Sequence, residues 1–453
     1  MGRCWFRSIN VMLWISIFLL AASPGWTDSS QGKGFNQPLT LPECIRIALE
    51  TNPLPQAAMK GILAAKESSG EALAPYFPDL SLQTRYAYWQ QRAFLPSGLS
   101  IPGRPVSRLI GPTDDWMAGL RARYTLFDSG ERRAQYQSAL ARQGVAEEEK
   151  ARIIQDLILG VHQGFYGLAA ALETRQVAEK NLSQIKEHLR LARERKAAGA
   201  VPLADVLRVQ VEAANGELSL VRAETLVRIS KGNLNTVMGL PAETPVVIAT
   251  TGDGIPSPDQ INLTQAFEQA VQGRPELKGA LKRIEASKSS VDLAKSAFGP
   301  KVRAEGSYGR RDTEFIPRDE EWLAGISIEW PLFTGFYRQH RLARAKAEVS
   351  KEEAEAKQLL LKVRQEVWTA HSKLKEAFEA VQATKALVRD AQESMRLAKE
   401  RYEVGAGTIT DLLDAQTALA RALATQVETE WDYHTAKAVF ERSIGRIPGE
   451  GKS

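Results

Sequence analysis

The sequence predicts a mainly α-helical fold with a small amount of membrane-type β-structure, built as two copies of one structural repeat. Three observations lead to this prediction. The chain of 453 residues matches itself segment by segment in a fixed order. Four segments alternate between apolar and polar side chains, as half-exposed strands do. Two proline-free segments of about 70 residues carry apolar side chains three and four positions apart, which indicates very long amphipathic helices.

The N-terminus has the features of a secretory signal peptide. Arg3 and Arg7 precede an uncharged apolar stretch that is too short to span a membrane, and turn-prone residues follow it. We therefore expect residues 1–27 to be removed on export; the alternative is an uncleaved anchor. Cleavage would leave Cys44 as the single cysteine, so the sequence predicts neither an intrachain disulfide nor a lipoprotein.

The charge balance argues against a nucleic-acid partner. The chain has 59 basic and 54 acidic residues, a formal net charge of +5, and no basic stripe interleaved with aromatic residues. After the predicted signal peptide, no apolar run approaches the ~20 residues that a membrane helix needs. A membrane role would have to use strands, whose sequence signal is alternation instead of bulk hydropathy.

The internal repeat organises the rest of the chain. Residues 41–53 match residues 263–275 at an offset of 222, and Trp116 matches Trp322 at an offset of 206. The offset changes where the first copy has a longer loop rich in Pro, Gly and Ser, and loops tolerate such differences better than packed elements do. The expected divisions are a signal peptide at 1–27, a first repeat at 28–241, a linker at 242–260, a second repeat at 261–447 and a tail at 448–453.

Each copy predicts the same order of helix, strand, strand, long helix and helix. In the first copy these are a helix at 41–74, strands at 79–90 and 116–127, a long helix at 129–198 and a helix at 202–238. In the second copy the strands are at 301–311 and 322–333, the long helix at 337–404 and the last helix at 408–444. A solvated structural coiled coil is the alternative interpretation of the long helices.

The strands favour a membrane over a soluble half-buried sheet, which is the alternative. Trp116, Tyr124, Trp322 and Trp330 lie near strand ends, where aromatic side chains meet a membrane–water boundary. Each strand has the ~10 residues that cross a bilayer when tilted. A sheet in lipid cannot leave its edges unpaired, and the smaller barrels need ~8 strands. One chain supplies four, so we expect it to pool strands with copies of itself, and three copies would give twelve.

Two kinds of segment resemble TolC-type outer-membrane efflux proteins. One is the strand-to-helix junction, YTLFDSG at 124–130 and WPLFTG at 330–335. The other is the break between the long and last helices, RYEVGAGTITDLLDAQ at 401–416, with a weaker twin at 195–210. The resemblance covers nearly the whole chain after the signal peptide.

This resemblance implies a homotrimer in the Gram-negative outer membrane. Its twelve-stranded β-barrel would be continuous with a twelve-helix periplasmic α-barrel, and the tunnel would be the exit duct of a tripartite efflux or type I secretion system. A periplasmic adaptor protein and an inner-membrane pump of the RND or ABC type would be its partners, with outer-membrane lipid around the barrel. It implies no cofactor, no bound metal and no enzymatic activity.

The resemblance also assigns the narrow end of the tunnel to the two helix breaks. Asp411 and Asp414 match carboxylates that ring the closed aperture, and Asp205 matches an acidic position at the neighbouring hairpin. Tyr402 matches a tyrosine that ties neighbouring helices shut. Gly407 stands where the best-known family member has an aperture arginine, so the sequence leaves the bonds that close the aperture open.

The spacing of Asp411 and Asp414 itself predicts how the acidic ring would act on ions. Carboxylates three positions apart share a helix face, and threefold symmetry would gather six of them around one axis. Like charges this close favour bound cations, so we expect a cation-selective constriction that multivalent cations block. The alternative is that Asp411 and Asp414 are ordinary helix-start acids. Gly199 and Gly405 would supply the turns at the hairpin tips. The resemblance implies that the adaptor docks at these tips, at Gly199, Gly405 and Gly407.

Other classes of function fit the sequence less well than an exit duct does. The main alternative is a periplasmic coiled-coil adaptor or scaffold without a pore, which would need one hairpin and soluble β-domains instead of a duplicated order of strands and helices. An enzyme finds less support, because the five histidines are scattered and no catalytic order of residues stands out. The cargo, whether a drug, a metal ion or a protein, stays open.

Overall fold

The computed structural model describes residues 37–90, 92–93, 109–110, 113–250 and 254–449. The predicted signal peptide at 1–27 and most of the long loop of the first repeat lie outside the described residues. Within the described part, no helix is both long enough and apolar enough to cross a membrane.

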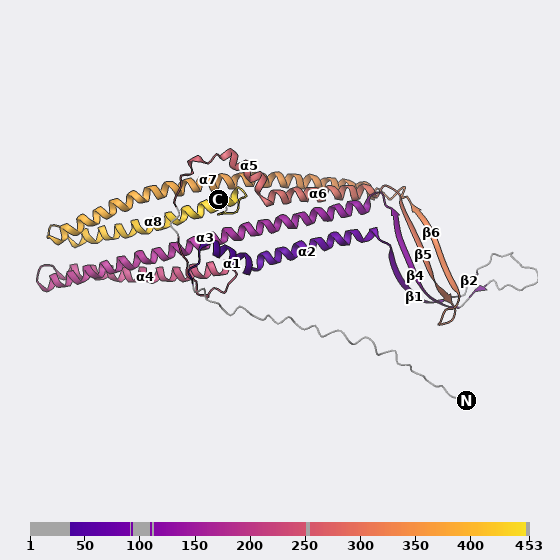
Figure 1. The fold of residues 1–453 in the computed structure, drawn as a ribbon, viewed down its shortest axis with the longest axis horizontal. Coiled ribbons are helices and arrows are strands. Elements are labelled where there is room, and N and C mark those ends of the chain that lie inside the picture. The colour runs from indigo at the N-terminus through magenta and orange to yellow at the C-terminus, as the bar shows by residue number, and fades with distance from the viewer. Residues whose placement is uncertain (1–36, 91, 94–108, 111–112, 251–253, 450–453) are drawn as a thin grey trace, which may run out of the picture.

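The molecule is an elongated array of helices with a β-sheet at one end (Figure 1). The first half contains α1 (Leu41–Thr51), α2 (Pro53–Leu73), β1 (Asp79–Trp89), β2 (Arg92–Ala93), β3 (Leu109–Ile110), β4 (Thr113–Phe127), α3 (Glu131–Ala197) and α4 (Leu203–Val237). The second half contains α5 (Leu263–Gly273), α6 (Pro275–Ser296), β5 (Lys301–Asp312), β6 (Glu320–Glu329), α7 (Tyr337–Glu403) and α8 (Ile409–Ser443). Apart from the short β2 and β3, the two halves have the same order of elements.

The single helix that we predicted at 41–74 is wrong: the structure has two helices there. The chain is extended at Asn52, and α2 begins at Pro53. A proline disfavours helical geometry in the residue before it but fits the first position of a helix. The second half breaks in the same way between α5 and α6, at Arg274 and Pro275. The proline that marks each break was present in the repeat motif.

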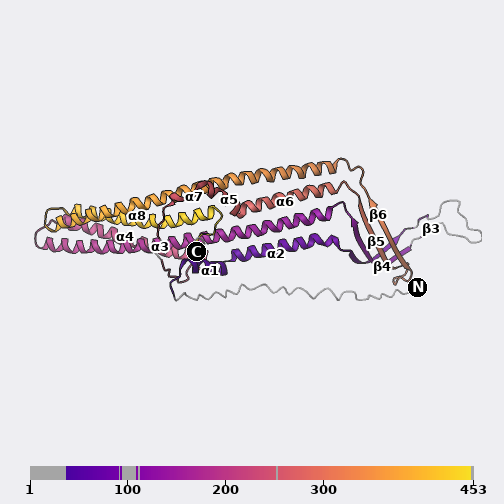
Figure 2. The ribbon, with the colours of Figure 1, turned by 45° about the horizontal axis from the view of Figure 1, so that its top comes forward.

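The long helices α3 and α7 run nearly the whole length of the helical part (Figure 2). Each has 67 residues, which corresponds to roughly 100 Å at ~1.5 Å per residue. Each is followed by a 35-residue helix, α4 or α8, that folds back along it. Helices α2 and α6 lie beside the sheet-proximal halves of α3 and α7, while α4 and α8 lie beside the distal halves, so four rods persist along the molecule.

The main sheet joins the two repeats. Its order is β1-β4-β5-β6, with every neighbouring pair antiparallel. Leu82 lies opposite Leu120, which lies opposite Tyr308, and Tyr308 lies opposite Trp322. Among the described residues, the outer sides of β1 and β6 have no partner strand. The sheet of one chain is therefore open at both edges.

The two faces of this sheet differ in chemistry. One face is apolar and exposed to solvent in the single chain; its large side chains include Leu80, Leu82, Tyr86, Leu120, Tyr308, Trp322, Ile326 and Ile328. The other face carries cross-strand ion pairs, namely Arg123–Asp79, Arg121–Glu305, Arg303–Glu329, Arg85–Asp115 and Arg311–Asp115. An exposed apolar face opposite a satisfied polar face is the arrangement of a lipid-facing strand array.

The corner from sheet to helix is built the same way in both halves. Ser129 and Gly130 take left-handed backbone angles before α3, as Gly335 and Phe336 do before α7. The Ser129 hydroxyl donates to the carbonyl oxygen of Pro300 at 2.8 Å, and this bond ties the first corner to the second repeat.

The apolar core is divided along the rods. One cluster packs α1 against α3 and α4, and a second packs α5 against α7 and α8. A third lies toward the distal end and joins the two hairpins; it contains Ile185, Ala192, Val206, Val209, Ala213, Tyr402, Ile409, Leu412 and Leu413. This third cluster holds the hairpin tips, where we predicted the aperture, next to each other.

Candidate functional site

The candidate site lies at the two hairpin tips, at the end of the molecule opposite the sheet (Figure 1). Gly199 and Gly405 have φ angles of +74° and +77°. The amide of the residue after each glycine donates back to the helix, to the carbonyl of Arg195 at 2.9 Å or of Arg401 at 2.8 Å. This is the hydrogen-bond pattern of a helix that ends at a left-handed glycine. Both glycines make the turns, as their sequence context predicted.

Gly407 has a different structural role from the two turn glycines, because it permits a close approach of the backbone. Its φ is not positive, but a Cβ atom there would lie 3.2 Å from Cβ of Arg401 and 3.3 Å from the amide nitrogen of Tyr402. The residue therefore lets the chain leaving the turn pass close to the end of α7. An arginine at this position would have to displace that contact.

Asp411 caps the helix on which it lies. Its carboxylate accepts from the backbone N–H of Thr408 at 3.1 Å, and the Thr408 hydroxyl accepts from the backbone N–H of Asp411 at 3.1 Å. This reciprocal pair satisfies two amide donors at the start of α8. The hydrogen bonds from Thr408 lower the pKa of the Asp411 carboxyl. Asp411 therefore stays charged at the tip and also serves as a helix-start acid.

Asp414 lies one turn farther along α8 and is exposed, while Leu412 and Leu413 beside it are buried. The two acids thus face away from the apolar seam that joins the hairpins. Asp205 is half-buried in the first turn of α4. Among the described residues, no hydrogen bond or ion pair joins Asp205 to the acids of α8.

Tyr402 lies inside the cluster between the hairpins. The residue is 4% exposed, and its hydroxyl has no hydrogen-bond partner among the described residues. Its ring instead meets the guanidinium of Arg195 from the other hairpin, at 4.6 Å from the ring centroid. Arg195 also donates to the carbonyl oxygens of Tyr402 at 3.1 Å and of Glu403 at 3.2 Å. These carbonyls are at the C-terminal end of α7, where a cation is favoured.

Sequence reasoning missed the residues that join the two hairpins. Arg195 begins the segment that matches 401–416, but its counterpart Arg401 bonds to its own turn at Ala406, so the repeat did not single it out. Arg208 on α4 donates to the hydroxyl of Thr410 on α8. Two basic side chains thus cross from the first hairpin to the second.

A buried amide fixes α8 against α3 farther from the tip. Gln416 is 2% exposed, and its side-chain nitrogen donates to Asn181 at 2.7 Å and to Gln184 at 2.6 Å. Gln416 closes the repeat motif, but its burial depends on the partner helix and could not be read from the motif.

The four aromatic residues predicted at the membrane boundary lie at different levels of the sheet: by strand register Trp322 is level with Leu120, four residues along β4 from Trp116, and Tyr124 is level with Ile326, four residues before Trp330. Trp116 contacts the ring of Tyr86 at 4.3 Å, and Trp322 is 72% exposed. Tyr124 and Trp330 lie eight residues further along the same strand directions, toward the helices. Eight residues span roughly 27 Å of extended strand, comparable with the ~25 Å apolar band of outer-membrane barrels.

The chemistry available at the tip is electrostatic. Asp411 and Asp414 are exposed carboxylates that form no ion pair with any described residue, and such groups attract cations. Among the described residues, no group of three or more His, Cys, Asp or Glu side chains is placed to hold a metal ion.

The likeness to known proteins covers most of the chain. Residues 44–240 and 266–446 match the family described as outer membrane efflux protein. Protein CyaE of Bordetella pertussis is 28% identical over 386 residues, which are 84% of this chain and 78% of that protein. The pyoverdine export outer membrane protein OpmQ of Pseudomonas aeruginosa is 24% identical, over 86% of this chain and 81% of that protein.

Solved structures show the same fold. The outer membrane protein VceC of Vibrio cholerae superposes with a TM-score of 0.74 at 20% identity, over 90% of this chain and 96% of that chain. The outer-membrane channel OprN gives a TM-score of 0.76 at 21% identity and covers 89% of both chains. With its long helical hairpins, its open sheet and the match along both repeats, the chain belongs to the outer membrane efflux protein family.

Proposed function

We propose that three copies of this chain assemble into one outer-membrane exit duct. The observation that carries the proposal is the four-stranded sheet, which is apolar and exposed on one face and unpaired at both edges. Three such sheets joined edge to edge make a twelve-stranded barrel, and no edge is then left in lipid. The ion-paired face would line the lumen, where water screens its charges.

Three copies would pool their helices in the same way as their strands. Four rods persist along the molecule, so a trimer gives a twelve-helix tunnel continuous with the barrel. The aromatic residues Trp116, Tyr124, Trp322 and Trp330 support a barrel that lies in the outer-membrane lipid, with the helices extending into the periplasm. Export by a cleaved signal peptide at 1–27, without lipidation, fits this location, and the two repeats at 28–241 and 261–447 are its building units.

The distal tips would form the periplasmic entrance. Asp411 and Asp414 from three chains would surround the axis, with Asp205 at the neighbouring hairpin. Tyr402 and Arg195 would hold the two hairpins of each chain together. The turns at Gly199, Gly405 and Gly407 would present the surface for a periplasmic adaptor and an inner-membrane pump of the RND or ABC type.

The names of some relatives state what those proteins export. The name of OpmQ specifies pyoverdine export, and other relatives are described as outer membrane proteins of efflux pumps, for example for toluene. The duct would serve a tripartite efflux or type I secretion system and would supply no chemistry of its own.

Conductance in a planar bilayer tests this function. The purified full chain should form cation-selective pores that a trivalent cation such as La³⁺ blocks from the tip side. The double variant Asp411→Asn with Asp414→Asn should lose the block, because the carboxylates that bind the cation are gone. Glu428→Gln, an exposed acid higher on the same helix α8, should keep the block.

Either of two results would overturn the proposal. A protein that inserts into outer-membrane vesicles but conducts no ions would favour a scaffold without a pore. A block that survives in the double aspartate variant would place the constriction elsewhere in the duct.

A further inference from the structure

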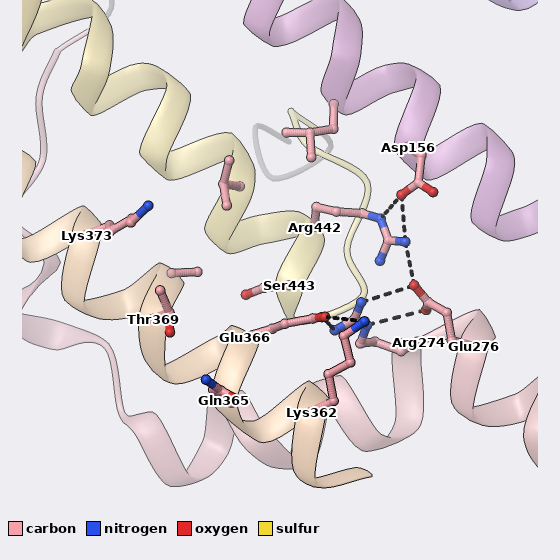
Figure 3. Close-up of a pocket in the computed structure, with 13 residues that line it drawn as sticks. Asp156, Arg274, Glu276, Lys362, Gln365, Glu366, Thr369, Lys373, Arg442 and Ser443 are labelled. Atoms are coloured by element: carbon pink, nitrogen blue, oxygen red, sulfur yellow. Dashed lines mark hydrogen bonds and ion pairs between the residues drawn. The ribbon is translucent and has the colours of Figure 1, made fainter. Parts of the chain in front are cut away.

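A cleft of about 540 Å³ lies where α8 ends and α6 begins, between α3 and α7 (Figure 3). It is far from both the tips and the sheet. Its lining comes from four helices and consists of Asp156, Leu159, Arg274, Glu276, Lys362, Gln365, Glu366, Thr369, Ala370, Lys373, Val439, Arg442 and Ser443. Known small-molecule sites have volumes of ~300–1,000 Å³, so the cleft is large enough for a small organic ligand.

One side of the cleft is a chain of ion pairs. Arg442 donates to Asp156 at 2.9 Å and to Glu276 at 2.7 Å. Arg274 donates to Glu276 at 3.0 Å and also to Glu366. Burial opposes ionisation of Glu276, but the hydrogen bonds from both arginines outweigh it and lower the pKa of this carboxyl to about 2. Glu276 is therefore charged at neutral pH.

After these ion pairs are counted, the cleft lining keeps an excess of positive charge and a hydrogen-bond donor that no described residue satisfies. Arg274, Lys362, Lys373 and Arg442 line the cleft against three carboxylates, so one positive charge is in excess. The side chain of Arg442 is 7% exposed, and its Nη1 atom is buried without a hydrogen-bond partner among the described residues. A buried charged donor without a partner is costly, so an acceptor is expected there.

The walls of the cleft away from the ion pairs include an apolar surface. Leu159, Ala370 and Val439 contribute apolar surface from α3, α7 and α8. Gln365 and Lys373 lie at the end of the cleft away from the ion pairs (Figure 3). Among the described residues, Lys373 has no ion-pair partner. The cleft thus combines unpaired donors with an apolar wall, which suits a ligand that is both anionic and apolar.

Packing of the junction does not by itself require these arginines. The first repeat has the same junction between α4 and α2, with Asn52 at the position of Arg274 and Thr236 at the position of Arg442. There, Asn52 donates to the carbonyl of Val237 at 2.8 Å, and Thr51 donates to that of Met238. Neutral hydrogen bonds therefore close the equivalent junction.

From these features we infer that the cleft binds a small organic anion, with its carboxylate or sulfonate at Nη1 of Arg442 and its apolar body against Leu159, Ala370 and Val439. Lys373 at the open end attracts the ligand and contributes to its affinity. The site does not depend on the pore, because the cleft lies within one chain.

Calorimetric titration of the full chain in amphipol tests this site with 2-naphthoate as the probe. We expect one probe bound per chain. The matched cation 2-naphthylmethylamine and the small anion acetate should show no binding at the same concentrations. The first lacks the negative charge that Arg442 requires, and the second lacks the apolar body.

Variants locate the binding. Arg442→Lys keeps the charge but removes the fork that carries Nη1, and should weaken binding about tenfold, equal to ~1.4 kcal/mol. Thr369→Trp should abolish binding, because the indole fills the cleft without removing any ion pair. Lys373→Gln should weaken it about threefold, in line with an exposed charge. Lys385→Gln, an exposed lysine on the same helix outside the cleft, should bind as the wild type does.

Equal binding of the cationic probe, or undiminished binding in Thr369→Trp, would overturn the inference. Absence of 2-naphthoate binding by the wild type up to millimolar concentration would do so as well. A chain that binds 2-naphthoate in this way but forms no pore would retain the cleft site and refute the duct, so the two proposals fail separately.

Discussion

Removal of the Arg195 side chain should weaken the attachment of the two hairpins of one chain to each other at the tip. Arg195 is half-buried at the end of α3 and bonds to the end of α7 in the other hairpin. Arg195→Ala keeps the helix, because alanine is the best helix former. The change therefore removes the contacts of Arg195 with the second hairpin without disturbing α3, and it leaves the bond from Arg208 to Thr410 and the apolar cluster between the hairpins in place.

The size of the effect can be worked out from the contacts. Two hydrogen bonds to carbonyl oxygens contribute about 1 kcal/mol each. The stack on the Tyr402 ring, with its centroid at 4.6 Å, adds about 0.5–1 kcal/mol at a partly exposed site. The total of about 3 kcal/mol corresponds to a roughly 100-fold shift of the equilibrium toward separated tips.

Single-channel recording without adaptor or pump measures this shift. If separation of the tips widens the entrance, Arg195→Ala should spend a far larger fraction of time in a high-conductance state than the wild type. Arg193→Ala is the matched control, since Arg193 is an exposed arginine on the same turn of α3. An Arg195→Ala channel with the wild-type closed fraction would refute the idea that this contact holds the entrance.

Two further predictions concern stability. Gly445→Ala should destabilise the fold by about 2–4 kcal/mol, measured by denaturant unfolding, because its φ is +78° and a Cβ would lie 2.5 Å from the backbone of Gly273. Gly61→Ala, where nothing lies within 4 Å, should instead stabilise α2 by about 0.5–1 kcal/mol, and equal effects of the two changes would contradict this assignment. Burial lowers the pKa of His162 to about 4 from 6.5. Between these pH values only the unfolded chain binds the proton, so stability should fall by about 3 kcal/mol as pH drops from 6.5 to 4. His162→Gln should lose this part of the pH dependence, and an unchanged slope would show that other groups cause it.

The strands and long helices could be predicted from the sequence because their signals are local. Alternation predicted a strand at 116–127, and the structure has one at Thr113–Phe127. The absence of proline and the spacing of apolar residues predicted a long helix at 337–404, and the structure has Tyr337–Glu403. The break at Asn52 was missed, although Pro53 marks it, because the apolar spacing continues across it.

In the candidate site, too, local features could be predicted from the sequence, while contacts between distant residues could not. Turn glycines such as Gly405 follow from backbone rules that act within a few residues, so the sequence was sufficient. The partner of Arg195 lies 207 positions away along the chain, and no local pattern specifies such a contact. The capping role of Asp411 was open to sequence reasoning, because Thr408 stands three residues before it, as capping boxes require.

The mass of the detergent-solubilised protein, corrected for bound detergent by light scattering, distinguishes a trimer from a single chain. Each chain has a mass of 50.0 kDa with its N-terminal segment. We expect a stable particle from the outer-membrane fraction with close to three times the mass of the processed chain. A stable monomer would leave both edges of the sheet unpaired in lipid and would contradict the pooled barrel.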